Sequence, residues 1–411
     1  MLLSNLSYSQ PDWEYNKILE DSIFNNRIKT CLLYSETNNR TIPKILINSN
    51  ERLVLQFDDL NLNPKNYMYK VYHCNYDWSI SDLSEIDYSE GFVNNFIENY
   101  DFSSLPNVQY VHYEEYIPNK NFNFIKSGNY ILSVYDYDSN NPLFNKRFIV
   151  YEDIVKINAN IHQSSIPRYR KFLHEIDFNV NLNNLEYFNI FSDCKVIIYQ
   201  NHNWYNSISD LVPSFINDNL LEYDYEYESS FNAGNNFRSF DTRSTRYKGE
   251  NIEKIFQDSV ITFVLKADKP YKSDFFSSIS DIDGYYIPDI HERNYPSINS
   301  DYVWVNFCLN FNNNFENNKI FIYGGLTNWK LSNNAILYYD KDLNCYENSL
   351  LLKQGYYNYS YLIIENDKIN NIDGDFFENN QIYNLFFYVH DYNYSYDRVV
   401  GFKKINSNSF F

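Results

Sequence analysis

The chain has 411 residues, a length that predicts about two to four domains. Its 34 lysines and arginines against 53 aspartates and glutamates leave a net charge of −19 at pH 7. A polyanion of this kind repels nucleic-acid phosphates and anionic lipid headgroups, so we expect no nucleic-acid partner and no direct lipid insertion. The 42 tyrosines and 32 phenylalanines suit strands, although a codon bias is an equally open explanation of the excess.

Glycine content and apolar runs narrow the class of protein further. The chain has ten glycines, well below the average of about 7%, and it contains neither a G-x-G-x-x-G pattern nor a P-loop. Common nucleotide enzymes are therefore not expected. The sequence has no run of about 18–20 apolar residues, so we expect no transmembrane helix. Residues 1–6 lack the basic region and the apolar core of a signal peptide, which leaves open a cytoplasmic protein or an exported one whose leader is missing.

Alternating apolar and polar residues predict strands throughout the first 150 residues. Leu53, Leu55 and Phe57, for example, share one face of a strand. The predicted strands here include 28–34, 53–57, 67–74, 108–117, 130–134 and 148–151. About seven short strands separated by polar turns are typical of an immunoglobulin-like sandwich. We assign this first β-sandwich to residues 1–153, with an irregular or short-helical insertion near 81–102.

Two further sets of strands follow along the chain. The second set is 155–161, 176–180, 196–199, 223–229 and 261–266, and the third is 303–307, 320–323, 335–339, 346–352, 357–363 and 385–390. In the third set Tyr357, Tyr359 and Tyr361 share one face and should be buried in register. We therefore predict an all-β protein of three consecutive immunoglobulin-like or early-set sandwiches, the second at 154–298 with a long arginine-bearing hairpin and the third at 299–411.

No motif of a reactive centre is visible in the sequence. His174-Glu175 and His291-Glu292 begin like a zinc-protease pair, but neither has a histidine four residues later. A G-x-S-x-G elbow is also missing. We therefore expect no enzyme, no catalytic residues, no cofactor and no metal ligands. An active site assembled from scattered residues remains an alternative.

The five cysteines are Cys31, Cys74, Cys194, Cys308 and Cys345. They are odd in number and form no C-x-x-C pair, so they predict neither a zinc site nor a disulfide framework. Buried free thiols are the expectation. A bridge between the first two or between the last two stays open, because each pair lies within one predicted domain.

Two groups of residues are candidates for interaction. Arg238, Asp241 and Arg243 belong to a basic cluster in an otherwise acidic chain, and they either pair locally or anchor a partner. The tryptophans Trp78, Trp204 and Trp329 each follow a predicted strand. Their indoles either close the ends of the sandwiches or contact a sugar or a protein.

Motifs spread over roughly residues 20–405 resemble the plug protein family of the type IX secretion system, formerly a domain of unknown function. Those that resemble its first domain are 55–60 (LQFDDL), 72–78 (YHCNYDW), 110–113 (YVHY) leading into 118–119 (PN), 128–130 (GNY) and 147–148 (RF). Those similar to its second domain are 174–178 (HEIDF), 200–204 (QNHNW), 234–238 (GNNFR) and 240–241 (FD). Those similar to its third are 323–329 (YGGLTNW), 351–357 (LLKQGYY) and 396–398 (YDR).

The resemblance implies a non-catalytic plug at the periplasmic face of the outer membrane. Such a protein closes the periplasmic mouth of the outer-membrane β-barrel translocon, its partner, while no cargo passes. The chain departs from the family at Ser239, where an aromatic residue is usual, at His202, where glycine is usual, and in the missing leader. The first two departures affect local packing and the third leaves the compartment open.

An alternative function comes from the third domain. Residues 325–329 and 355–359 also look like the early-set sandwiches that bind α-glucans, in which a tryptophan, here Trp329, stacks on sugar. This alternative is a carbohydrate-binding or accessory protein of a glycan-uptake complex.

Overall fold

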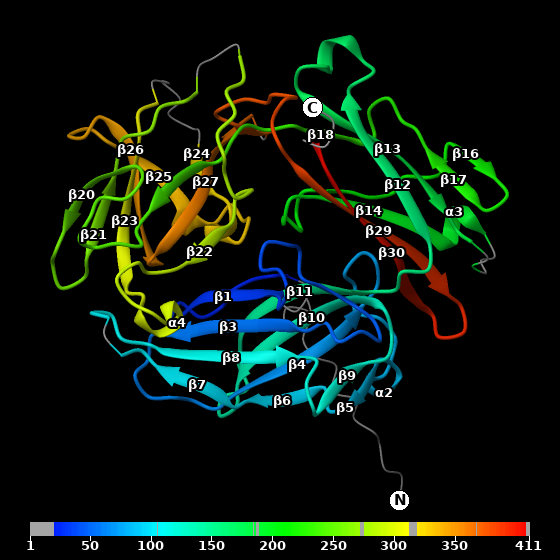
Figure 1. Ribbon diagram of the computed structural model, residues 1–411, viewed down its shortest axis with the longest axis horizontal. Coiled ribbons are helices and arrows are strands. Elements are labelled where there is room, and N and C mark those ends of the chain that lie inside the picture. The colour runs from blue at the N-terminus through cyan, green and yellow to red at the C-terminus, as the bar shows by residue number, and fades with distance from the viewer. Residues whose placement is uncertain are drawn as a thin grey trace, which may run out of the picture.

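β-Strands make up nearly all of the regular secondary structure in the computed structural model, which describes residues 20–104, 106–183, 185, 189–271, 275–311, 319–366 and 368–407. The prediction of an all-β protein is confirmed. The α-helices of the described residues are single turns, namely α2 (Glu85–Tyr88), α3 (Ile190–Asp193) and α4 (Pro296–Asn299). Figure 1 shows three groups of strands around a common centre, with the N-terminal group below the other two. The expectation about residues 1–6 lies outside the described residues.

The first sandwich encloses one core between two sheets. Its strands are β1 (Ile28–Ser35), β2 (Lys44–Leu46), β3 (Leu53–Asp59), β4 (Tyr67–Cys74), β6 (Asn94–Ile97), β7 (Asn99–Phe102), β8 (Val111–Ile117), β10 (Gly128–Asp136) and β11 (Pro142–Tyr151). They are ordered β1-β3-β8-β7 and β2-β11-β10-β4-β6. Leu53, Leu55 and Phe57 are fully buried in the core between these sheets, as their alternation predicts.

The segment expected to be an irregular insertion contributes edge strands instead. It contains α2 and β5 (Ser89–Gly91), which pairs with β9 (Phe122–Phe124), and it also supplies β6 and β7. β6 pairs with β4 and β7 with β8, so each of the two sheets ends on a strand of this segment. The short helix was expected, but the strands were not, because their exposed aromatic residues give no clear alternation.

The middle sandwich is built from two distant parts of the chain. One sheet has β12 (Lys156–Gln163), β13 (Leu173–Asn181), β16 (Phe215–Asn217), β17 (Leu220–Tyr223) and β18 (Ser230–Asn232), beside the 3-10 turn η1 (Pro167–Tyr169). The other sheet is β15-β14-β29-β30, formed by β14 (Cys194–Gln200), β15 (Ser207–Ile208), β29 (Ile382–Asp391) and β30 (Tyr396–Asn406). In Figure 1 the red C-terminal strands accordingly lie among green ones.

The third sandwich folds one long sheet over a single core. Its strands are β19 (Arg238–Asp241), β20 (Ile252–Phe256), β21 (Thr262–Leu265), β22 (Tyr286–Pro288), β23 (Tyr302–Leu309), β24 (Lys319–Tyr323), β25 (Ile336–Asp340), β26 (Cys345–Lys353), β27 (Gly355–Glu365) and β28 (Lys368–Asn371), with the 3-10 turns η2 (Gly325–Thr327) and η3 (Asn333–Ala335). Phe240 of β19 and Ile252 of β20, from opposite ends of the sheet, meet in this core. Tyr357, Tyr359 and Tyr361 are buried there in register, as predicted.

Strand pairing therefore differs from the predicted division at 153 and 298. β19 pairs with β27, so the arginine-bearing segment belongs to the third core and not to a hairpin of the middle one. The strand predicted at 385–390 is part of β29, which pairs with β14 of the middle sandwich. Of the strand predicted at 223–229, Tyr223 is the last residue of β17 and the rest is the connection to β18. Alternation locates strands but carries no information about distant partners. We propose units of 28–151, of 156–232 with 382–406, and of 238–371.

The substitution Phe387→Ala tests this discontinuous middle sandwich. Phe387 is fully buried in the middle core, so its loss should lower the free energy of unfolding by about 3–5 kcal/mol and reduce hydrogen-exchange protection in β14. The matched control is Phe215→Ala in β16, which removes an exposed ring and should change stability by less than about 0.5 kcal/mol. Equal effects of the two substitutions on the urea unfolding midpoint would contradict the assignment.

Candidate functional site: the junction of the three sandwiches

The first and middle sandwiches are joined face to face by an apolar cluster that is separate from the cores of the sandwiches. It takes Ile131 and Ile149 from the first sandwich and Ile197, Phe386 and Val399 from the middle one. These side chains point away from their own cores, which is why β10 and β29 are buried on both faces. An apolar contact between domains opposes their relative motion more than a polar one does.

Trp78 and Trp204 meet within this cluster, although they are 126 positions apart. Their ring centroids are 5.1 Å apart at an interplanar angle of 73°, an edge-to-face geometry that aromatic pairs favour. The Trp78 indole N–H donates to the hydroxyl of Tyr199 over 3.1 Å. The Arg147 guanidinium lies 4.5 Å from the centre of the Trp78 ring. These contacts favour the structural interpretation, in which the indoles close the sandwich ends.

A buried ion pair joins the first sandwich to the third. Lys353 Nζ lies 2.6 Å from Asp58 Oδ2, and the two residues are 2% and 0% exposed. His112 Nδ1 lies 2.6 Å from the other carboxylate oxygen, and Tyr302 donates its hydroxyl to Asp58 over 2.6 Å. Burial alone would raise the pKa of Asp58, but the charge of Lys353 and the hydrogen bond from His112 hold it below its usual range.

The middle and third sandwiches meet through polar and aromatic side chains. The Asn203 side chain donates to the Tyr323 hydroxyl over 2.7 Å, and the rings of His202 and Tyr285 lie 4.1 Å apart. Burial lowers the pKa of His202 to about 3, so its imidazole is neutral at physiological pH.

Trp329 lies at this same contact and is half-buried. Its ring packs edge-on against Tyr323 and Phe237 at centroid distances of 5.5 and 5.9 Å. A Cβ on Gly284, whose φ is +77°, would lie 2.3 Å from the indole, so glycine permits this close approach. An indole covered in this way offers less ring face to a sugar, and the contacts favour capping over α-glucan binding.

A cavity of about 390 Å³ occupies the centre of the junction. Trp204 and Trp329 line it together with Lys146, His112 and His202. His112 Nε2 and His202 Nδ1 are buried and have no hydrogen-bond partner among the described residues. The junction thus combines three contacts between sandwiches with a central cavity that residues of all three sandwiches line.

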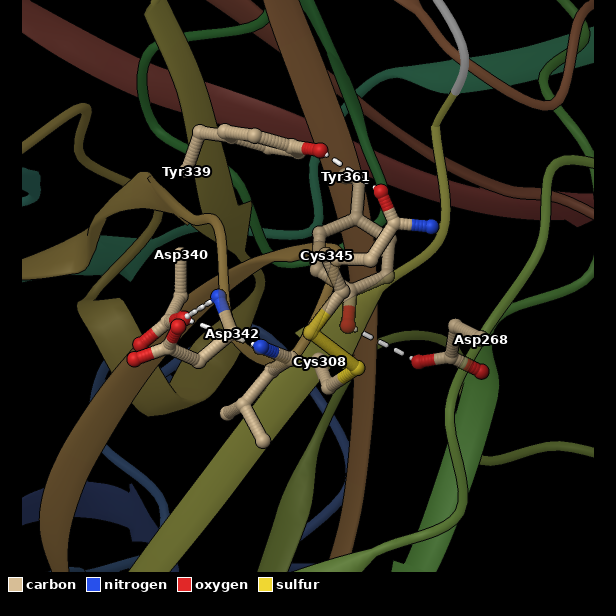
Figure 2. Close-up of a disulfide and its surroundings, with 9 residues drawn as sticks. Asp268, Cys308, Tyr339, Asp340, Asp342, Cys345 and Tyr361 are labelled. Atoms are coloured by element: carbon tan, nitrogen blue, oxygen red, sulfur yellow. Dashed lines mark hydrogen bonds between the residues drawn. A yellow bond between two sulfur atoms is a disulfide. The ribbon is translucent and has the colours of Figure 1, made fainter.

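Arg238 lies in the third sandwich and pairs within it. Its guanidinium nitrogens lie 3.0 Å from Asp268 Oδ1 and 2.7 Å from Asp373 Oδ1. Burial would lower the pKa of Arg238, but these two carboxylates raise it above its usual value. Tyr361 donates its hydroxyl to Asp268 over 2.8 Å and lies beside the disulfide Cys308–Cys345, as Figure 2 shows. One of the two bridges left open by the sequence is therefore present, and Cys31, Cys74 and Cys194 are buried free thiols.

Asp241 and Arg243 form a local pair. Arg243 donates from Nε and Nη2 to the two oxygens of Asp241 over 3.0 and 2.7 Å. The structure thus brings Trp78 and Trp204 together, places Trp329 at the same junction, and engages Arg238, Asp241 and Arg243 within the third sandwich. Sequence reasoning missed Asp58, His112 and Lys353. One signal could have indicated a buried ion pair, namely the charged Lys353 directly after the three leucines of 350–352.

These observations define the class of the molecule as a β-sandwich protein whose units are fixed through a common junction. Residues 28–152, which form the first sandwich, match the model of the family described as "Type 9 secretion system plug protein 1st domain", and this match supports the type IX secretion system plug family for that sandwich. The family name indicates a secretion component. Within the described residues, no helix has the length and apolar character needed to cross a membrane.

A solved structure extends the similarity beyond the first sandwich. A hypothetical protein from Parabacteroides merdae aligns with a TM-score of 0.89 and 28% identity, over 93% of this chain and 98% of that chain. The C-terminal domain of the antigen I/II-family protein AspA of Streptococcus pyogenes aligns with 6% identity and a TM-score of 0.16, over 92% of this chain and 99% of that chain, which supports no inference. None of the curated proteins matches the chain.

The substitution Lys353→Met tests the ion pair. It leaves Asp58 as a buried charge without its cationic partner, and we expect the free energy of unfolding at pH 7 to fall by about 3–5 kcal/mol. Adding Asp58→Asn in the same chain should recover most of this loss, because the uncompensated charge is then gone. The control Lys254→Met removes an exposed lysine and should shift the urea midpoint little. A single substitution with no larger effect than the control would show that the pair contributes nothing.

Acid sensitivity tests the neutral state of His202. Its folded-state pKa of about 3 lies below the unfolded value of about 6.5, so the unfolded chain takes up a proton that the folded chain refuses. Stability should therefore fall as pH drops below about 6.5. Replacing His202 with glutamine should reduce the loss between pH 6.5 and 4.5 by about 2–3 kcal/mol. The control His291→Gln removes an exposed imidazole, and equal slopes for the two variants would contradict the assignment.

Proposed function

We propose that this protein is the non-catalytic plug subunit of a type IX secretion system, closing the periplasmic mouth of its outer-membrane β-barrel translocon when no cargo passes. The observation that carries the proposal is the family match of the first sandwich. The rigidity of the junction supports it, because a body that blocks a wide aqueous pore must not open between its parts. A preorganised surface also binds at a lower entropic cost than one that must order itself.

Three further observations support this proposal, the first on the compartment, the second on membrane attachment and the third on contact with a partner. The Cys308–Cys345 disulfide is typical of proteins that fold in an oxidising compartment such as the bacterial periplasm. The net charge of −19 discourages non-specific contact with anionic lipid, so attachment to the membrane would depend on the protein partner. Exposed aromatic residues at the outer edge of the first sandwich, including Phe96 and Phe102, are of the type that anchors protein interfaces.

Co-purification tests the partner. An affinity-tagged chain, expressed in a bacterium that has the type IX system and extracted with the outer membrane in mild detergent, should co-purify with the barrel translocon. The double substitution Phe96→Ala with Phe102→Ala removes exposed rings without opening the core, and it should weaken recovery if that edge is the contact. The control Phe215→Ala removes an exposed ring from the middle sandwich. Recovery of the wild-type chain only as a free monomer would refute the proposal.

A permeability assay tests closure itself. A strain lacking the chain should admit a large antibiotic that the intact outer membrane excludes, because the unplugged barrel leaks. Complementation with the wild type should restore exclusion, whereas Lys353→Met, which loosens the junction, should restore it less well at equal protein level. Unchanged permeability in the deletion strain, with secretion intact, would count against a plug and leave only an accessory role.

A further inference from the structure

Three side chains with metal-binding atoms lie together on β12 and β13 of the middle sandwich. His162 and Glu175 are direct partners across the two strands, and Asp177 follows Glu175 on the same face of β13 because side chains alternate along a strand. His162 Nε2 lies 2.5 Å from Asp177 Oδ2 and 3.8 Å from Glu175 Oε1. One ligand atom from each of the three residues lies within 4.8 Å of the other two.

Each side chain except Asp177 is held in place by a second contact. His162 Nδ1 is 2.9 Å from the carbonyl oxygen of Gln163 and can donate to it, which directs Nε2 toward the two carboxylates. Ser165 donates its backbone N–H and its hydroxyl to the two oxygens of Glu175 over 2.8 and 2.7 Å. Outer contacts of this kind, with a backbone carbonyl on the far nitrogen of the histidine, are typical of metal-binding side chains.

The cluster carries more negative charge than its one imidazole can balance. Glu175 is 1% exposed, and Asp177 Oδ1 is buried without a hydrogen-bond partner among the described residues. A buried carboxylate oxygen with no donor calls for a cation or another ligand.

We propose that His162, Glu175 and Asp177 bind a divalent transition-metal ion, Zn²⁺ being the representative. An imidazole nitrogen suits zinc and its neighbours, whereas calcium and magnesium take oxygen ligands alone. Ligands around tetrahedral zinc are roughly 3.4 Å apart, so the two nitrogen–oxygen separations need to change by less than about 1 Å. Three protein ligands leave one position for water. The ion would link β12 to β13. This proposal does not depend on the proposed role in secretion.

Titration of the full chain with zinc chloride, followed by calorimetry, tests the site. We expect one zinc ion per chain, and the substitutions His162→Ala and Asp177→Asn should each weaken binding at least about tenfold. Asp177→Asn is nearly isosteric and keeps the test informative if the histidine variant fails to fold. The matched control is His390→Ala, since His390 Nδ1 also lies 2.8 Å from an aspartate, Asp397 Oδ1, but lacks a third ligand. It should bind zinc like the wild type.

A thermal-shift measurement gives a second readout. Zinc should raise the unfolding midpoint of the wild type and of His390→Ala but not of the two ligand variants, and calcium should raise none of them. The proposal is overturned if the wild type shows no saturable zinc binding, or if both ligand variants bind zinc as tightly as the wild type. In the second case the ion would belong elsewhere, for example to one of the free cysteines.

Discussion

The buried pair of Asp58 and Lys353 is the constraint on which the arrangement of the sandwiches depends. Removing two charges from water is costly, and their attraction compensates only when the geometry is good and the remaining lone pairs are satisfied. Here His112 and Tyr302 supply the additional hydrogen bonds to Asp58. The pair therefore specifies one docking of the third sandwich on the first, because any sliding would leave a carboxylate buried without a donor. It selects an orientation more than it adds stability.

The other two contacts use different physics. The first and middle sandwiches share an apolar cluster, with Trp78 and Trp204 inside it, and the ion pair of Arg398 with Glu152 also joins them. The middle and third meet through mixed polar and aromatic contacts such as Asn203 with Tyr323. Apolar burial supplies affinity between two units, and directional bonds set the angle of the third. Each of the three sandwiches is thus in contact with both others, an arrangement that supports the proposed role as a plug.

Sequence reasoning recovered the local structure well and the distant pairings poorly. Alternation located the strand of Tyr357, Tyr359 and Tyr361 and its buried face, since that information lies in neighbouring residues. It could not reveal that β29 pairs with β14, or that Asp58 meets Lys353 across 295 positions. The sequence singled out the tryptophans as candidates for capping or for contact, but the meeting of Trp78 and Trp204 across two sandwiches could be seen only in the structure. Glu175 was dismissed as part of a helical zinc motif, although its partner, His162, lies across the strand and not four residues onward.

The return of the C-terminal strands to the middle sandwich has a consequence for how the molecule is made. A polypeptide synthesised from its N-terminus has made β12 to β18 of that sandwich by residue 232, but it must then make the whole third unit before β29 and β30 can pair with β14. A chain that stops before these two strands therefore lacks part of its middle sandwich, although the missing residues are C-terminal. Only a chain that includes β29 and β30 can complete the middle sandwich, and only such a chain can present a continuous surface to a partner.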